Sequence, residues 1–133
     1  MDIPFKKLQY TFQTKPLLVG GKAKEYYEVR KAGEDIDFIV TKNDYDNLAK
    51  IYPNNTEDLF GDFGVKIHGF ELWTSICLFD YDYLSKDSIE NEEYKIISLE
   101  KLLLLTALGM KEEKYKKDLD LIVKKILNIQ YKK

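Results

Sequence analysis

The sequence predicts a mixed α+β domain, in which helices flank a mixed sheet and a pair of helices follows it. Short apolar runs that end at glycine, proline or asparagine alternate with stretches whose apolar residues recur every three or four positions. From Ser98 onward only the helical pattern is present. The chain has 133 residues, of which 44% are hydrophobic, which suits one domain with its own core. We therefore expect a single domain over residues 1–133, with an N-terminal helix or arm (1–15), a sheet core (16–97) and C-terminal helices (98–130).

The first half of the chain predicts alternating strands and helices. Scattered apolar residues over 5–13 suit a short helix or an extended arm, which Pro16 ends. Gly20-Gly21 and a turn over 31–34 separate the next segments. The expected elements are a strand over Leu17–Val19, a helix over Lys22–Arg30, a strand over Asp35–Val40, and a helix that has Asn43 or Asp44 as its N-cap and ends near Tyr52.

The second half predicts three strands and then two helices. Alternating apolar residues mark the strands, and the last helix carries one clear apolar stripe. The expected elements are strands over Val65–Ile67, Phe70–Leu78 and Tyr94–Ile97, a helix that Ser98 opens and Gly109 ends, and a helix from about Glu112 to Ile129.

Charge and composition exclude several classes of protein. The net charge of −2 gives no broad basic field for nucleic acid, although lysines gather near the C-terminus. Cys77 is the one cysteine, so neither an intrachain disulfide nor a cysteine-based zinc cage can form, which favours a reducing, cytoplasmic setting. The N-terminal residues lack the apolar segment of a signal peptide, and the apolar run over 96–110 is too short and too polar to span a bilayer. We expect no membrane association.

Two acidic residues in one predicted strand suggest a metal site. Residues i and i+2 of a strand point to the same face, so Asp35 and Asp37 place two carboxylates about 7 Å apart, given a rise of roughly 3.3 Å per residue. Ile36 then points into the core. Two carboxylates at that spacing repel each other unless a cation lies between them, and oxygen ligands of this kind suit Mg²⁺. Gly20-Gly21 lets the backbone approach a phosphate closely, and the following helix offers free N–H groups.

The same residues carry a family resemblance. The segment from Leu18-Val19-Gly20-Gly21-Lys22-Ala23 through Arg30 to Asp35-Ile36-Asp37-Phe38 resembles the motif of the nucleotidyltransferase superfamily, which has the DNA polymerase beta-like fold. Ala23 and Arg30 also resemble the toxin–antitoxin and phage-defence (abortive-infection) branch. Two C-terminal segments, 98–103 and 117–121, are similar to the helices that close this branch, so the resemblance covers roughly residues 16–125.

This resemblance implies a fold, an activity and a set of site residues. It implies a nucleotidyltransferase fold that moves a nucleoside monophosphate from an NTP to an acceptor hydroxyl on RNA, a protein or a small molecule, with Mg²⁺ or Mn²⁺. Asp35 and Asp37 would bind the metals, and a third carboxylate on an adjacent strand would help to activate the acceptor. Glu71 in Phe70-Glu71-Leu72 is the best match for the third carboxylate, with Asp80 and Asp82 in reserve. Gly20, Gly21, Lys22 and Arg30 would form the nucleotide side of the site.

Three features depart from the family pattern. The spacing from Arg30 to Asp35 is one residue longer than expected, and Gly33-Glu34 replaces the usual Thr or Ser before the first aspartate. Thr106 stands where the family often has a lysine that would help to hold the triphosphate. The last departure bears on turnover more than on the fold.

The sequence is also compatible with two other functions. The chain is alternatively a catalytically silent member of the fold that binds a partner protein, such as an antitoxin or a regulatory subunit, or a bare nucleotide-binding module. The single histidine, His68, fits a surface or packing role better than a catalytic one, and Cys77 fits a small core residue. The C-terminal lysines fit the solvated face of a helix.

Overall fold

A seven-stranded mixed sheet, in the order β3-β4-β5-β2-β1-β9-β8, is the centre of the fold in this computed structural model, which describes residues 2–109 and 111–132. A short antiparallel hairpin, β6–β7, lies apart from it. The strands are β1 (Leu17–Val19), β2 (Ile36–Ile39), β3 (Thr56–Leu59), β4 (Asp62–Ile67), β5 (Phe70–Trp73), β6 (Ser75–Ile76), β7 (Phe79–Asp80), β8 (Ile89–Glu90) and β9 (Lys95–Ile96). The sheet and its helices confirm the predicted mixed α+β class.

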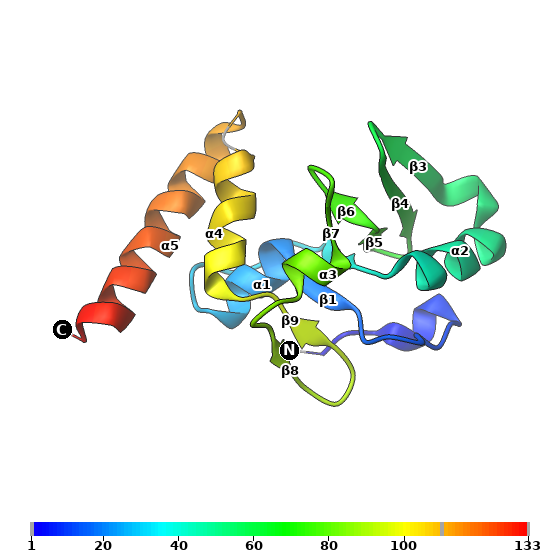
Figure 1. Ribbon diagram of the computed structural model, residues 1–133, viewed down its shortest axis with the longest axis horizontal. Coiled ribbons are helices and arrows are strands. Elements are labelled where there is room, and N and C mark those ends of the chain that lie inside the picture. The colour runs from blue at the N-terminus through cyan, green and yellow to red at the C-terminus, as the bar shows by residue number, and fades with distance from the viewer. Residues whose placement is uncertain (1, 110, 133) are drawn as a thin grey trace.

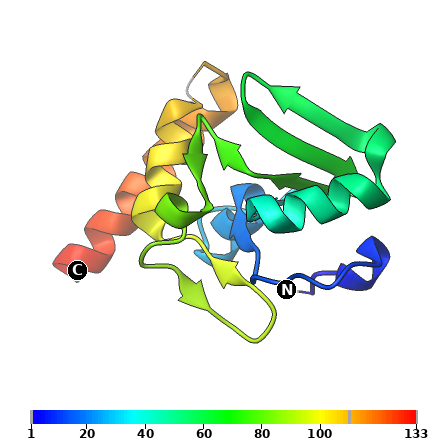
Figure 2. The ribbon, with the colours of Figure 1, turned by 45° about the vertical axis from the view of Figure 1, so that its right-hand side comes forward.

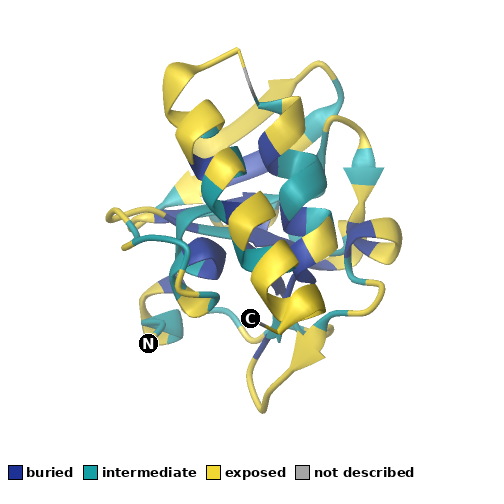
Figure 3. Cartoon of the chain, turned by 90° about the vertical axis from the view of Figure 1, so that its left-hand side faces the viewer, coloured by how far each residue is buried: buried dark blue, intermediate teal, exposed yellow. Residues whose placement is uncertain are grey.

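Helices lie around and beyond this sheet. They are α1 (Gly20–Tyr26), α2 (Lys42–Ile51), α3 (Tyr81–Leu84), α4 (Leu99–Leu108) and α5 (Glu113–Tyr131), with 3₁₀ turns η1 (Phe5–Leu8) and η2 (Pro53–Asn55). The α4–α5 pair stands at one end of the molecule and the β3–β4 hairpin at the other (Figure 1). Seen from the side of the helical pair, exposed residues cover its outward surface (Figure 3). No helix among the described residues has the length and apolar character that crossing a membrane requires.

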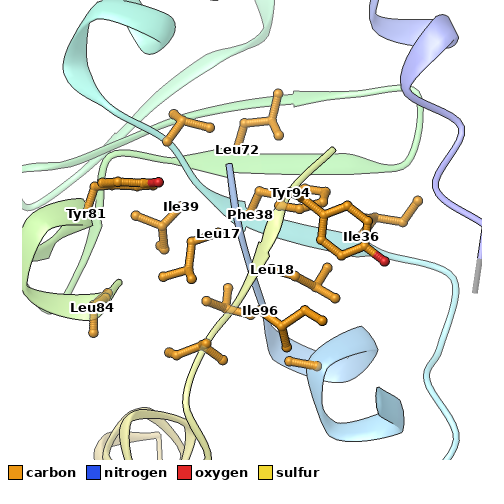
Figure 4. Close-up of a cluster of buried hydrophobic side chains, with 14 of the residues drawn as sticks. Leu17, Leu18, Ile36, Phe38, Ile39, Leu72, Tyr81, Leu84, Tyr94 and Ile96 are labelled. Carbon is orange, nitrogen blue, oxygen red and sulfur yellow. The ribbon is translucent and has the colours of Figure 1, made fainter. Parts of the chain in front are cut away.

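The core forms where the central strands are apolar on both faces. Phe38 and Ile39 are consecutive residues of β2 and both are fully buried, as the sequence predicted for the end of this strand. Leu17 and Leu18 of β1 and Leu72 of β5 complete the centre of the cluster (Figure 4). Because helices or loops cover both faces here, the strands carry continuous apolar runs rather than strict alternation.

The pairing of the three central strands sets the position of the acidic residues. Strand β1 runs antiparallel to β2, with Val19 opposite Asp37. Strand β5 runs parallel to β2, with Glu71 opposite Asp37. The expected adjacency of the strands at 17–19 and 35–40 is therefore confirmed.

Several predicted boundaries were wrong. Helix α1 begins at Gly20 rather than Lys22 and ends at Tyr26 rather than Arg30. Glu28 is left-handed (φ 60°), and the N–H groups of Glu28 and Val29 donate to the carbonyls of Glu25 and Lys24. These two hydrogen bonds form a Schellman cap. Such a cap usually has glycine at the left-handed position, so nothing in the local sequence indicated that the helix ends here.

The N-cap of α2 and two strands also differ from expectation. Thr41 caps α2, accepting a hydrogen bond from the Asp44 N–H at 3.2 Å, in place of Asn43 or Asp44. Strand β3 was not predicted, because all four of its residues are exposed and show no apolar alternation. The expected strand over 70–78 breaks after Trp73, and its last part becomes the β6–β7 hairpin.

Asp44 joins the N-terminal segment to α2. Its side chain is fully buried and accepts hydrogen bonds from the Tyr10 hydroxyl at 2.5 Å and from the Gln13 and Thr14 amides at 2.9 and 3.1 Å. The N-terminal segment consequently lies along α2 (Figure 2). A buried carboxylate with several donors leaves those donors unsatisfied if it is removed.

We expect Asp44→Ala to lower the free energy of unfolding by about 2–4 kcal/mol, because it leaves buried N–H and O–H groups without an acceptor. Urea denaturation measures this loss. The matched control is Asp46→Ala, which removes a half-exposed carboxylate that pairs with Lys42 across one helical turn and should cost about 0.5 kcal/mol or less. Equal losses in the two variants would contradict this role for Asp44.

Candidate functional site

A cleft of about 360 Å³ lies between the sheet and the helical pair, and it contains the predicted acidic residues. Asp35, Asp37 and Glu71 line it on the sheet side. The end of α4, the beginning of α5 and the β6 strand line its other walls. The three carboxylates that the sequence analysis singled out therefore line one cavity.

A larger hollow of about 730 Å³ lies beside α2 and includes the reserve candidates Asp80 and Asp82. Neither Asp37 nor Glu71 lines it. Asp80 caps α3 by accepting a hydrogen bond from the Tyr83 N–H at 3.0 Å. The smaller cleft is the candidate site, because Asp35, Asp37 and Glu71 all line it.

Asp37 and Glu71 lie side by side on one face of the sheet. They are direct partners in the parallel pairing of β2 and β5, and neighbouring strands are roughly 4.8 Å apart. Asp35 lies just before β2 and is exposed. Its charge nevertheless acts on Asp37, as does the charge of Glu71.

Gly20 leaves room for the Asp37 carboxylate. A Cβ on Gly20 would lie 2.3 Å from Asp37 Oδ2, and Gly20 has a φ of +66°, which favours glycine. The predicted closeness of the glycine pair to the carboxylates is confirmed at Gly20. Because β1 ends and α1 begins at this residue, the first helical turn faces the carboxylate.

The electrostatics of Asp37 are unusual for an aspartate. The pKa of Asp37 is raised from the ordinary 3.8 to about 7, mainly because the carboxyl group is buried and in addition because of the nearby charges of Glu71 and Asp35. Lys24 and Lys114 act in the opposite direction but more weakly. A carboxyl group in this position is ready to exchange its proton for a cation.

Glu71 is held by its neighbours on the sheet. The Trp73 indole N–H donates to Glu71 Oε1 at 3.4 Å, and Lys66 Nζ lies 3.9 Å from the same oxygen. Lys66 is closer to Glu57, at 3.0 Å, and is itself half exposed. The weak contact with Lys66 leaves Glu71 available to a stronger cation.

The residues predicted for the nucleotide side of the site differ in whether they line the cleft. Gly20 lines the cleft, whereas Gly21, Lys22 and Arg30 are not among its lining residues. Arg30 Nε donates to Asp118 Oδ1 at 2.9 Å, and its Nη1 donates to the Lys31 carbonyl at 2.9 Å. Thr106 lines the cleft, but its hydroxyl donates to the Leu102 carbonyl at 2.8 Å.

The sequence analysis did not identify three residues that line the cleft, Lys24, Lys114 and Tyr115. The Lys24 ammonium group forms an ion pair with Asp118. Lys24 lies one helical turn after Gly20, so the spacing of a helix that begins at Gly20 would have identified it as a site residue. Lys114 and Tyr115 come from α5, and only the tertiary fold brings that helix to the sheet.

A buried ion cluster fastens α5 to α1. Asp118 is almost fully buried, and its two oxygens lie 2.9 Å from Lys24 Nζ and 2.9 Å from Arg30 Nε. Both cations lower the pKa of the Asp118 carboxyl against the effect of burial. The two contacts fix how α5 closes the cleft.

The donor set of the cleft fits a hard divalent cation in part. Over residues 2–109 and 111–132, no three Asp, Glu, His or Cys side chains are arranged to hold a metal ion together. Mg²⁺, however, is commonly bound by one or two carboxylates and takes its other ligands from phosphates and water. The adjacent pair of Asp37 and Glu71 meets that smaller requirement.

Comparison with known proteins adds no family. No family model matches the sequence, and no curated protein matches it. The function is therefore inferred from the cleft and its residues.

We expect Gly20→Ala to destabilise the fold by more than the cost of a left-handed alanine, because its Cβ would overlap the Asp37 carboxylate. The matched control is Gly69→Ala, which has a φ of +84° but no heavy atom within 4 Å of the added Cβ. The control should cost about 1–2 kcal/mol, and Gly20→Ala should cost more in urea denaturation. Equal costs would show that the Gly20–Asp37 contact is unimportant.

We expect Asp37→Asn to stabilise the protein at pH 8 in metal-free buffer. The carboxyl group of Asp37 has a higher pKa in the folded than in the unfolded chain, so the free energy of unfolding falls as the pH rises from about 4 to about 7. This loss is complete above pH 7. The gain in the free energy of unfolding is at most roughly 4 kcal/mol, and it is smaller if water reaches the Asp37 carboxyl group. The gain should shrink toward pH 4 in melting experiments.

The control for Asp37→Asn is Asp35→Asn, in which the side chain is exposed. It should change the free energy of unfolding by about 0.5 kcal/mol or less at either pH. If Asp37→Asn melted below wild type at pH 8, Asp37 would be a structural residue.

Proposed function

We propose that this protein is a nucleotidyltransferase that moves a nucleoside monophosphate from an NTP to an acceptor hydroxyl, with Mg²⁺ or Mn²⁺. The observation that carries the proposal is the pairing of Asp37 with Glu71 across β2 and β5, beside Gly20. A strand, a glycine pair, a helix and an antiparallel acidic strand occur together, and this order supports the nucleotidyltransferase fold. The resemblance to the toxin–antitoxin branch belongs to the same proposal.

The residues divide the work by position. Asp35, Asp37 and Glu71 are the proposed metal ligands, and the metal would neutralise phosphate charge and orient the reacting groups. Glu71 also accepts the proton of the acceptor hydroxyl. The acceptor oxygen attacks the α-phosphorus, and pyrophosphate leaves with the electrons of the broken P–O bond.

The glycine loop serves the nucleotide side. Gly20 and Gly21 open α1, and the first N–H groups of that helix have no partners within the helix. Lys22 is partly exposed next to them. Arg30 contributes indirectly, since its contact with Asp118 positions α5. NTPs are cytoplasmic metabolites, so we place this activity in the cytoplasm.

Two observations favour a second candidate, a silent member of the fold that binds a partner protein. The three carboxylates are not arranged as a ready metal cage within the described part of the chain. Thr106 also supplies no charge to the cleft. A protein of this kind would bind neither Mg²⁺ nor NTP with measurable affinity.

The test of the enzyme is Glu71→Gln, assayed for NTP binding by calorimetry and for label transfer from NTP into cell extract. We expect binding close to wild type, because Asp35 and Asp37 remain, and transfer reduced about 100-fold or more. The matched control is Glu57→Gln, which removes a carboxylate from β3 that pairs with Lys66 and lies outside the cleft.

Control transfer should stay near the wild-type rate. Transfer by Glu71→Gln at the wild-type rate would contradict the role of Glu71. If wild type bound no NTP at millimolar Mg²⁺, the partner-binding alternative would be the better account.

A further inference from the structure

Two lysines from distant parts of the chain face the same cleft. Lys24 belongs to α1 and Lys114 to α5, and both line the cleft. Their ammonium nitrogens lie 4.9 and 5.0 Å from the centre of the Tyr115 ring. Gly109 allows this ring to pack closely, because a Cβ there would lie 3.1 Å from Tyr115 Cδ2. The Tyr115 ring thus lies beside both cations.

The two lysines differ in how firmly they are held. The Lys24 side chain is only 3% exposed, and within the described residues Asp118 is the one hydrogen-bond acceptor of its ammonium group. An ammonium group has three N–H donors, so Lys24 keeps donors for a further acceptor. The Lys114 side chain is 67% exposed, and its ammonium group lies 3.5 Å from the exposed Glu112 carboxylate. One cation is therefore buried in an ion cluster, and the other is in contact with solvent.

The charges across the cleft are complementary. Lys24 and Lys114 line the same cleft as Asp37 and Glu71. Lys114 also lowers the pKa of Lys24, after the larger effect of burial, so the two ammonium groups repel each other. Repelling carboxylates at one wall call for a cation, and repelling ammonium groups at the other wall call for an anion. A metal-chelated polyphosphate supplies both.

We propose that Lys24 and Lys114 form the subsite for the β- and γ-phosphates of the NTP, opposite the Asp37–Glu71 pair. This inference rests on the proposed function and extends it to the leaving group, which is pyrophosphate. The subsite compensates for Thr106, whose hydroxyl is committed to the Leu102 carbonyl and brings no positive charge to the cleft. Lys114 reaches the same cleft from α5 instead.

The test is calorimetric titration of wild type, Lys114→Gln and Lys114→Glu at fixed ionic strength. The probes are inorganic pyrophosphate with Mg²⁺, each of the four ribonucleoside triphosphates with Mg²⁺, and the corresponding monophosphates. The matched controls are Lys116→Gln and Lys116→Glu, which make the same charge changes two residues further along α5, outside the cleft. Lys114 and Lys116 are both exposed, so the variants should fold.

We expect Lys114→Gln to weaken the binding of Mg–pyrophosphate and of the bound triphosphate by about tenfold each. Lys114→Glu should weaken both further, and monophosphate binding should stay within about twofold of wild type. Both Lys116 variants should bind every probe as wild type does. Equal pyrophosphate affinity in the Lys114→Gln and Lys116→Gln proteins would overturn the subsite.

Failure of the proposed function gives a different result. In that case wild type would bind Mg–pyrophosphate in a Lys114-dependent way but would transfer no label from any NTP. Such a protein would have the phosphate subsite without the transferase activity. Wild type that bound neither pyrophosphate nor any triphosphate would overturn both proposals.

Discussion

The close contact between Gly20 and Asp37 is the constraint on which the cleft depends. Strands β1 and β2 are neighbours, and β1 ends where the Asp37 carboxylate needs space. Any side chain at position 20 would overlap that carboxylate, whose residue is the direct cross-strand partner of Glu71. The position of Asp37 beside the beginning of α1 therefore depends on one residue without a side chain.

A second constraint closes the cleft from the other side. The ion cluster of Lys24, Arg30 and Asp118 connects α1, the loop after it and α5. Removing one partner from a buried cluster of this kind is costly, because it leaves an uncompensated charge. Helix α5 is consequently held at the distance that lets its first turn contribute Lys114 and Tyr115 to the cleft. Lys24 belongs to this ion cluster and also lines the cleft.

The sequence predicted the parts of the fold and site that depend on local pattern. The strands at 17–19 and 35–40, the final helices and the proximity of Gly20 to Asp37 follow from apolar runs, glycine and the two-residue period of strands. Features that depend on tertiary contacts were not predicted. Glu28 ends α1 in a conformation that glycine usually adopts, β3 pairs at an edge without an apolar pattern, and Lys114 reaches the cleft only through the packing of α5.

The β6–β7 hairpin turns through Cys77 and Leu78, both of which have left-handed backbones (φ 50° and 65°) although neither is glycine or asparagine. Each costs about 1–2 kcal/mol. Asp62 offsets this strain, since its carboxylate accepts hydrogen bonds from the Ser75 hydroxyl and from the N–H groups of Cys77 and Leu78. These three hydrogen bonds hold the strained turn in the conformation that the structure shows. Because Ser75, Ile76 and Cys77 line the cleft together with Asp62, one carboxylate of β4 supports the part of the cleft wall that the hairpin forms.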